Sequence, residues 1–143
     1  MVRASNIYIE RVAQSRLPQV DFQNLPFGKT FADHMFIADY RKGEWKNLQV
    51  VPYGYMPISP ASPAIHYGQA IFEGLKAYRG KDGEALVFRP LDNWRRLNTS
   101  AERMALATVP EEIFMGGIGQ LIDLDRAWIP DAAESSLYIR PYL

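Results

Sequence analysis

Alternation of apolar and polar residues predicts two β-hairpins and a final strand. The first hairpin joins a strand beginning at residue 31 to the segment WKNLQVVPY at 45–53, with Lys42-Gly43 as the turn. The second joins LKAYR at 75–79 to EALVFR at 84–89 through a glycine-containing turn. The segment SLYIRPYL at 136–143 predicts the last strand.

Apolar residues at three- and four-residue steps predict helices between these strands. A short helix is expected over residues 64–73, ending at Gly74, because glycine readily adopts the left-handed conformation that terminates helices. The clearest helix is expected to begin at Pro90 and to run to Met104 with one buried apolar stripe.

A third helix has a less regular pattern. It is expected to begin at Thr108, because Thr108 and Glu111 have the spacing of a capping box, and to end before Pro130. Glycines at positions 116, 117 and 119 each lower its stability by about 1 kcal/mol relative to alanine. Its inner face is expected to consist of Ile113, Leu121, Leu124 and Trp128.

Strands mixed with helices in this order predict an α+β domain, with helices packed on a largely antiparallel sheet. Residues 1–28 are expected to be a loosely patterned lead-in, and residues 29–143 the domain itself. The last strand is apolar up to Leu143 and has no polar tail. We therefore expect further polypeptide after it.

Composition is typical of a soluble globular protein, with 48% hydrophobic and 22% charged residues. Sixteen basic and 16 acidic residues give no net charge, which argues against nucleic-acid binding. The absence of cysteine excludes disulfides and thiol catalysis and fits a cytoplasmic location. Two histidines argue against a histidine-rich metal site, and no apolar run is long enough to cross a membrane.

Three arginines lie on or beside the apolar stripe of the clearest helix: Arg95, Arg96 and Arg103. The simpler interpretation is a solvated basic face. The alternative is that one of them binds a phosphate or a carboxylate, because a guanidinium group makes paired hydrogen bonds to such anions. Helical periodicity does not identify which arginine this would be.

Two further groups of residues also allow two interpretations. Tyr138 and Arg140 point to the same face of the last strand, where they either bind a carboxylate or remain at a solvated edge. His66, Tyr67, Phe72 and Glu73 lie close to Gly74, either as ordinary core and turn residues or as a wall facing a small molecule.

Four segments together resemble the branched-chain amino acid aminotransferases, which are pyridoxal-phosphate enzymes of fold type IV. They occur in the family's order and cover most of the chain from Phe27 onward. The FEG sequence, a hairpin and an arginine–leucine helix are shared across fold type IV, whereas FGKTFADHM and LYIRP are more specific to the branched-chain enzymes. The segments are FGKTFADHMF (27–36), HYGQAIFEGLKAYRG (66–80), FRPLDNWRRLNTSA (88–101) and WIPDAAESSLYIRP (128–141).

This resemblance implies the smaller, N-terminal domain of a two-domain, homodimeric enzyme. The complete enzyme would exchange the amino group of leucine, isoleucine or valine with 2-oxoglutarate through pyridoxal 5'-phosphate. By position, Arg96 rather than Arg95 matches the arginine that holds the cofactor phosphate.

The resemblance also implies a substrate pocket. Phe27, Tyr67 and Phe72 match residues that line the pocket for the substrate side chain, and the tyrosine reaches into the neighbouring subunit's site. Tyr138 and Arg140 match the pair near the substrate carboxyl groups, where the arginine accepts the side-chain carboxylate of glutamate. An aromatic cage with one arginine at its rim suits both kinds of substrate.

The family's Schiff-base lysine is absent from this sequence. In the family it lies in the C-terminal domain, in a Lys-Gly-Gly-Asn-Tyr-like segment, so we expect it beyond Leu143 and expect no catalytic residue here. The 143-residue chain alone is therefore expected to be inactive. The alternatives are a D-amino acid aminotransferase or an aminodeoxychorismate lyase of the same fold, or a non-catalytic binding domain. The lysines without that context are Lys29, Lys42, Lys46, Lys76 and Lys81.

Overall fold

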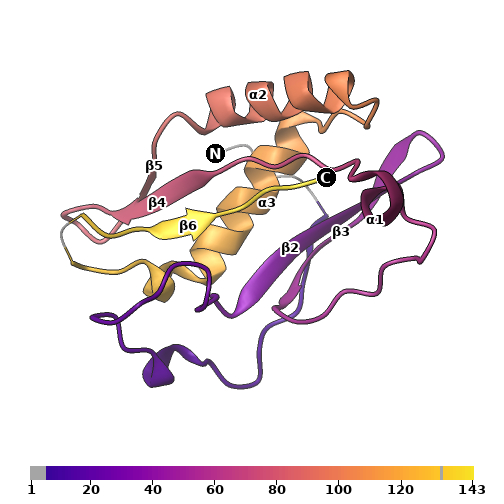
Figure 1. Cartoon of the computed structure of the whole chain (residues 1–143). Helices are drawn as coiled ribbons and strands as arrows, with labels where there is room; N and C mark the ends of the chain where they lie inside the picture. Colours follow the sequence, from indigo (N-terminus) through magenta and orange to yellow (C-terminus); the bar gives the residue numbers. More distant parts are fainter. Residues whose placement is uncertain (1–5, 133) are drawn as a thin grey trace.

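Two three-stranded sheets and two long helices share one core in the computed structural model, which describes residues 6–132 and 134–143 (Figure 1). The strands are β1 (Tyr8–Ile9), β2 (His34–Arg41), β3 (Glu44–Pro52), β4 (Leu75–Arg79), β5 (Ala85–Val87) and β6 (Leu137–Ile139). The α-helices are α1 (Pro63–Tyr67), α2 (Pro90–Arg103) and α3 (Glu111–Leu124), and the 3-10 helices are η1 (Leu17–Gln19) and η2 (Arg126–Trp128).

Both sheets are built on the predicted hairpins. The first has the order β1-β3-β2 and the second the order β5-β4-β6. All pairings are antiparallel except that of β1 with β3. Lys42 and Gly43 form the first turn with positive φ angles. The predicted α+β class, the two hairpins and α2 are confirmed.

The core lies where α2 and α3 pack against the sheets. Leu97 of α2 and Ile122 of α3 are fully buried, and apolar residues of β4 and β6 belong to the same cluster. The glycines of α3 are buried in this interface, and the Phe36 ring lies so close that a Cβ on Gly117 would be 2.4 Å from it. Gly117 therefore permits close packing between α3 and the Phe36 ring of β2.

The expected inner face of α3 is only partly correct. Ile113 is buried as expected, but Leu121 and Leu124 are only half-buried, and Trp128 belongs to η2. The sequence pattern assigned burial to large residues, whereas the buried face of this helix includes its small glycines.

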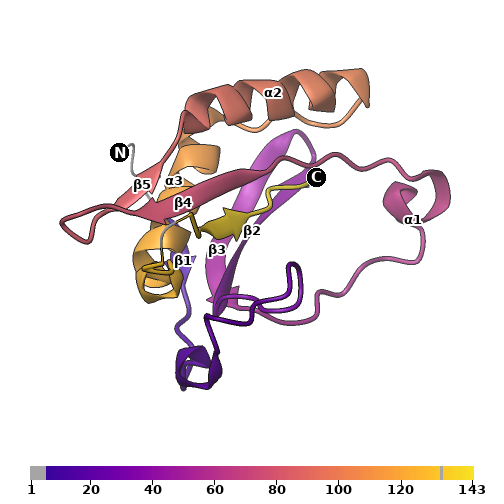
Figure 2. The ribbon, with the colours of Figure 1, turned by 60° about the vertical axis from the view of Figure 1, so that its left-hand side comes forward.

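The short helix is shorter than expected. It ends at Gly68, which has φ 61°, whereas the prediction placed its end at Gly74. Residues 69–74 are not helical, because this segment pairs with the end of the chain: Ile71 exchanges backbone hydrogen bonds with Leu143, and Glu73 N–H donates to Pro141. Figure 2 shows α1 standing apart from both sheets.

The predicted capping box at Thr108 is wrong. The third helix begins at Glu111, with Pro110 at the capping position and no side-chain cap. The preceding Val109 is held on α2, because its backbone N–H and carbonyl both bond the side chain of Asn98. This tertiary contact takes the place of a local cap.

The lead-in contains structure that the sequence pattern did not predict. Its strand β1 pairs with β3, and its short helix η1 projects from the rest of the chain in both ribbon views (Figures 1 and 2). Within residues 6–132 and 134–143, no helix combines the length and the apolar character needed to span a bilayer.

Candidate functional site

The extended segment 71–78 places alternate side chains on two faces of the second sheet. Ile71, Glu73, Leu75 and Ala77 are buried against the helices. The residues between them face the other way, and Phe72 is 65% exposed. We call the first side the inner face and the second the outer face. The predicted site residues divide between these two faces.

Four predicted residues meet on the outer face and form what we call the outer cluster: Phe27, Phe72, Tyr138 and Arg140. The guanidinium carbon of Arg140 lies 4.3 Å from the centre of the Phe72 ring and 5.1 Å from that of Tyr138. Arg140 Nη2 also donates to the Tyr138 hydroxyl over 2.9 Å. Phe27 meets Tyr138 edge to face at 5.3 Å.

Gly74 makes room for this cluster. A Cβ atom on Gly74 would lie 2.2 Å from the Tyr138 hydroxyl oxygen, so the tyrosine ring lies directly across the glycine backbone. The sequence analysis gave Gly74 the role of ending a helix. Its role in the structure is close approach, which a residue with a side chain would prevent.

The outer cluster offers two chemical environments side by side. Its three aromatic rings suit an apolar ligand group, and its guanidinium suits a carboxylate. Arg140 is exposed, and no carboxylate of the described residues lies within ion-pair distance of it. Its stacking on Phe72 and its bond to Tyr138 hold the guanidinium in place without neutralising it.

The outer face continues into an apolar hollow of about 450 Å³ beyond the outer cluster. Tyr78 lies opposite Leu86 in the β4–β5 pair, and Phe88 is 76% exposed. A face with this many exposed apolar side chains is typical of a surface that another polypeptide covers. The hollow is lined by Tyr78, Leu86, Val87 and Phe88.

On the inner face, Glu73 and Arg96 form a two-bond ion pair. Arg96 Nε lies 2.5 Å from Oε1 of Glu73, and Nη2 lies 2.7 Å from Oε2. Glu73 is only 4% exposed and also accepts a bond from Asn93. The hydrogen bonds from Arg96 lower the pKa of Glu73, although burial opposes them, and the same pair raises the pKa of Arg96. The carboxylate therefore stays ionised and fixes the guanidinium.

Arg96 keeps part of its guanidinium available. Its side chain is 68% exposed, and within the described part of the chain Nη1 makes no hydrogen bond. These remaining donors fit a phosphate oxygen. Arg95, next to it on α2, instead pairs with Asp92 three residues earlier on the same helix. The two arginines that periodicity left equivalent thus have different surroundings.

Arg96 lies on the face opposite the outer cluster, and Tyr67 joins neither that cluster nor the Glu73–Arg96 pair. Tyr67 lies on α1 and is 85% exposed, and its aromatic neighbour among the described residues is His66, with ring centres 6.3 Å apart. His66 Nε2 lies 2.7 Å from the carbonyl of Pro60, so this histidine supports the local loop. The role assigned to Tyr67 stays a prediction.

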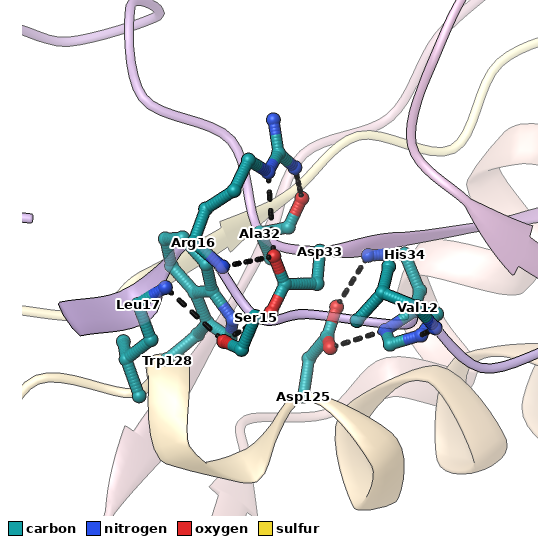
Figure 3. Close-up of polar contacts among 9 residues, drawn as sticks. All are labelled: Val12, Ser15, Arg16, Leu17, Ala32, Asp33, His34, Asp125 and Trp128. Atoms are coloured by element: carbon teal, nitrogen blue, oxygen red, sulfur yellow. Dashed lines mark hydrogen bonds and ion pairs between the residues drawn. The ribbon is translucent and has the colours of Figure 1, made fainter. Parts of the chain in front are cut away.

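Sequence reasoning missed a buried polar centre at the start of β2 (Figure 3). Asp33 is 3% exposed, and its carboxylate accepts bonds from Ser15 Oγ, the backbone and side chain of Arg16, and Trp128 Nε1. Burial raises the pKa of Asp33, but these hydrogen bonds outweigh it and lower the pKa to about 2. Adjacent polar residues entering an apolar strand were the signal available in the sequence.

His34 belongs to the same polar centre but is fully engaged. Its Nε2 accepts the backbone N–H of Val12 over 3.0 Å, so its Nδ1 carries the proton and donates to Asp125 over 2.6 Å. Asp125 also accepts the backbone N–H of His34. Both ring nitrogens are occupied by these contacts, so this buried pair is structural.

Fold and site together define a small α+β domain that carries a ring-and-guanidinium cluster on one face and a buried carboxylate–arginine pair on the other. No family model matches the chain. It is similar to proteins named branched-chain-amino-acid aminotransferase or transaminase. It is 48% identical to a probable aminotransferase of Staphylococcus aureus (strain MRSA252) over 124 residues. Identity is 45% with transaminase 1 of Bacillus subtilis (strain 168) over 124 residues, and 49% with the aminotransferase of Mycolicibacterium smegmatis over 122 residues.

These alignments confirm the resemblance to branched-chain amino acid aminotransferases. They cover 86%, 86% and 84% of this chain, but only 34%, 35% and 33% of the three relatives. The chain thus spans about a third of the length of the relatives that it matches.

Proposed function

We propose that this chain is the small domain of a branched-chain amino acid aminotransferase. As part of a longer polypeptide it would help to exchange the amino group of leucine, isoleucine or valine with 2-oxoglutarate, using pyridoxal 5'-phosphate. The observation that carries the proposal is the outer cluster, which joins aromatic rings and an available guanidinium. The identity to relatives with this name supports the same conclusion.

In this proposal the outer cluster binds both kinds of substrate. Phe27 and Phe72 contact the aliphatic side chain of a branched-chain amino acid, and Arg140 binds the side-chain carboxylate of glutamate. Tyr138 holds Arg140 through its hydroxyl. The charge-assisted bond between Arg140 and the glutamate carboxylate would contribute about 1.5–3 kcal/mol net. The aromatic faces hold the guanidinium without an acidic partner, so it remains attractive to a carboxylate.

The cofactor phosphate would bind to Arg96. Glu73 holds this guanidinium through Nε and Nη2, and Nη1 makes no hydrogen bond within the described part of the chain. When bound, pyridoxal phosphate supplies the electron sink for amino-group transfer. The catalytic lysine would come from the part of the protein that this chain does not contain.

The remaining assignments follow from the same proposal. Residues 29–143 would be the domain proper, with residues 1–28 as its lead-in. We infer a homodimer in which Tyr67 reaches the partner subunit's site, and its 85% exposure on α1 suits that role. The exposed apolar residues of the outer face suit burial by the rest of the enzyme. A cytoplasmic location is supported by the absence of cysteine.

A chimera tests the proposal. This chain would replace the aligned third of Branched-chain-amino-acid transaminase 1 of Bacillus subtilis, to which it is 45% identical. The chimera is expected to bind pyridoxal phosphate and to transaminate L-leucine, L-isoleucine and L-valine with 2-oxoglutarate, whereas the 143-residue chain alone is inactive. Activity with D-alanine but not with L-leucine would contradict the proposal, as would cofactor binding without any transamination.

A further inference from the structure

The segment that carries Phe27 is a loop closed at its base. We call residues 17–32 the Phe27 loop. Arg16 immediately before it donates its backbone N–H to Asp33 immediately after it, over 3.0 Å. The Arg16 side chain spans the same gap, with Nε bonded to Asp33 and Nη2 bonded to the Ala32 carbonyl over 2.6 Å. Figure 3 shows these bonds converging where the two ends of the loop meet.

The carboxylate of Asp33 also ties this base to the core. Ser15 Oγ lies 2.5 Å from Oδ2 of Asp33 and accepts the backbone N–H of Leu17, the first residue of the loop. The indole N–H of buried Trp128 donates to the same Oδ2 over 3.0 Å. One buried carboxylate therefore joins the end of the lead-in, the start of β2 and the helical segment that follows α3.

Little else holds the Phe27 loop in place. Every residue from 21 to 31 is exposed, and the loop curves over a hollow of about 290 Å³ that reaches Trp128. Phe31 stacks on Tyr53 with ring centres 4.7 Å apart, close to the base. Phe27 itself is 77% exposed and meets the body of the protein in an edge-to-face contact with Tyr138. Its position thus depends on the geometry at the base.

We propose that Asp33 is a positioning residue for the substrate pocket. Its carboxylate holds the Phe27 loop in the arrangement that places Phe27 against Tyr138, so it sets the fit of the apolar substrate side chain without touching the substrate. This inference rests on the proposed function, which assigns Phe27 to that pocket. A small displacement of a residue that contacts the substrate lowers the activity strongly. Several bonds to one buried carboxylate at the base of the loop would limit such a displacement of Phe27.

The neighbouring carboxylate provides a matched control. Asp125 is 2% exposed and lies in the same polar centre, but its side chain bonds to His34 and, among the described residues, makes no hydrogen bond to the Phe27 loop. Asp33→Asn and Asp125→Asn therefore each replace one buried carboxyl group by an amide. Only the first removes acceptors at the base of the loop.

Hydrogen exchange in the chimera tests directly whether Asp33 holds the Phe27 loop in place. In Asp33→Asn, peptides covering residues 17–32 are expected to exchange about tenfold faster than in the parent, whereas in Asp125→Asn they exchange at the parental rate. Ser15→Ala removes one donor to Asp33 and the acceptor of the Leu17 N–H but leaves the Asp33 carboxylate in place. It is therefore expected to give a smaller increase, about threefold, even where Asp33→Asn folds poorly. Unchanged exchange in both Asp33→Asn and Ser15→Ala would overturn the inference.

Steady-state kinetics test whether Asp33 affects substrate binding through Phe27. Phe27→Ala and Asp33→Asn are each expected to raise the KM for L-leucine about tenfold, with a smaller change in kcat. If Asp33 acts through Phe27, Asp33→Asn has no further effect on this KM in the Phe27→Ala background. Additive effects would overturn the inference while leaving the proposed function intact. An unchanged KM in Phe27→Ala would overturn the pocket assignment in the proposed function, and the inference with it.

Discussion

The two faces of the extended segment 71–78 differ in what holds the arginine on each side. On the inner face, Arg96 is paired through two bonds with the buried carboxylate of Glu73. On the outer face, Arg140 rests on aromatic rings and bonds a neutral hydroxyl. The inner pair contributes to stability and fixes a guanidinium. The outer cluster is largely exposed and leaves its guanidinium available. Neighbouring residues of one extended segment thus hold one guanidinium by a buried carboxylate and the other by aromatic rings.

The largest expected effect comes from Glu73→Ala, compared with Phe72→Ala beside it. Removing the buried carboxylate takes away two charge-assisted bonds from Arg96 and one of the two acceptors of Asn93, so we expect the domain to lose about 3 kcal/mol of unfolding free energy. Phe72 is 65% exposed, so Phe72→Ala should cost under about 1 kcal/mol. Urea unfolding of the chimera followed by fluorescence measures both. Equal losses would break the distinction between the two faces.

Arg96→Ala compared with Arg95→Ala sharpens the assignment of the inner face. The two arginines are neighbours on α2, but only Arg96 is fixed by Glu73. We expect Arg96→Ala to weaken the affinity for pyridoxal phosphate about thirtyfold, because one charge-assisted contact is lost. Arg95→Ala should change it less than about twofold. Fluorescence titration of the apo-chimera with cofactor gives both dissociation constants. Similar losses in the two variants would discredit the phosphate role.

Lowering the pH should reduce the contribution of the buried carboxylates Asp33 and Glu73 to the unfolding free energy. The outer cluster has no carboxylate and should be unaffected. The pKa of Asp33 is lowered to about 2 from 3.8, so its stabilising contribution is complete above about pH 5 and is lost as the pH falls towards 2. This contribution is about 2 kcal/mol. The pKa of Glu73 is also lowered, so its stabilising contribution is likewise lost as the pH falls. The stability difference between the parent chimera and Asp33→Asn should therefore shrink between about pH 5 and pH 2 in urea titrations. A difference that does not change with pH would contradict this account.

Local signals in the sequence were sufficient for about half of the fold. Alternation found the hairpins, and α2 was found from Pro90 and its apolar stripe. The end of α1 and the start of α3 were misplaced, because distant partners decide them: residue 71 pairs with residue 143, and Val109 bonds to Asn98. A single sequence does not display such pairings.

The candidate site was predictable to a similar extent. Alternation placed Tyr138 and Arg140 on one face, which the structure confirms. Phe27 and Phe72 were joined to them only by the family resemblance, because a sequence gives no distance between segments so far apart. Asp33 was missed for the same reason, since its partner Trp128 lies 95 residues away.

The ratio of kcat/KM for L-glutamate to kcat/KM for L-leucine, measured in the chimera, tests most directly whether the outer cluster binds both substrates. Arg140→Ala is expected to lower this ratio about tenfold, because the carboxylate loses its charged partner. Phe72→Ala is expected to raise it about threefold, because the aliphatic side chain loses an aromatic contact. Ratios that move in the same direction in both variants, or that stay at the parental value, would contradict the account.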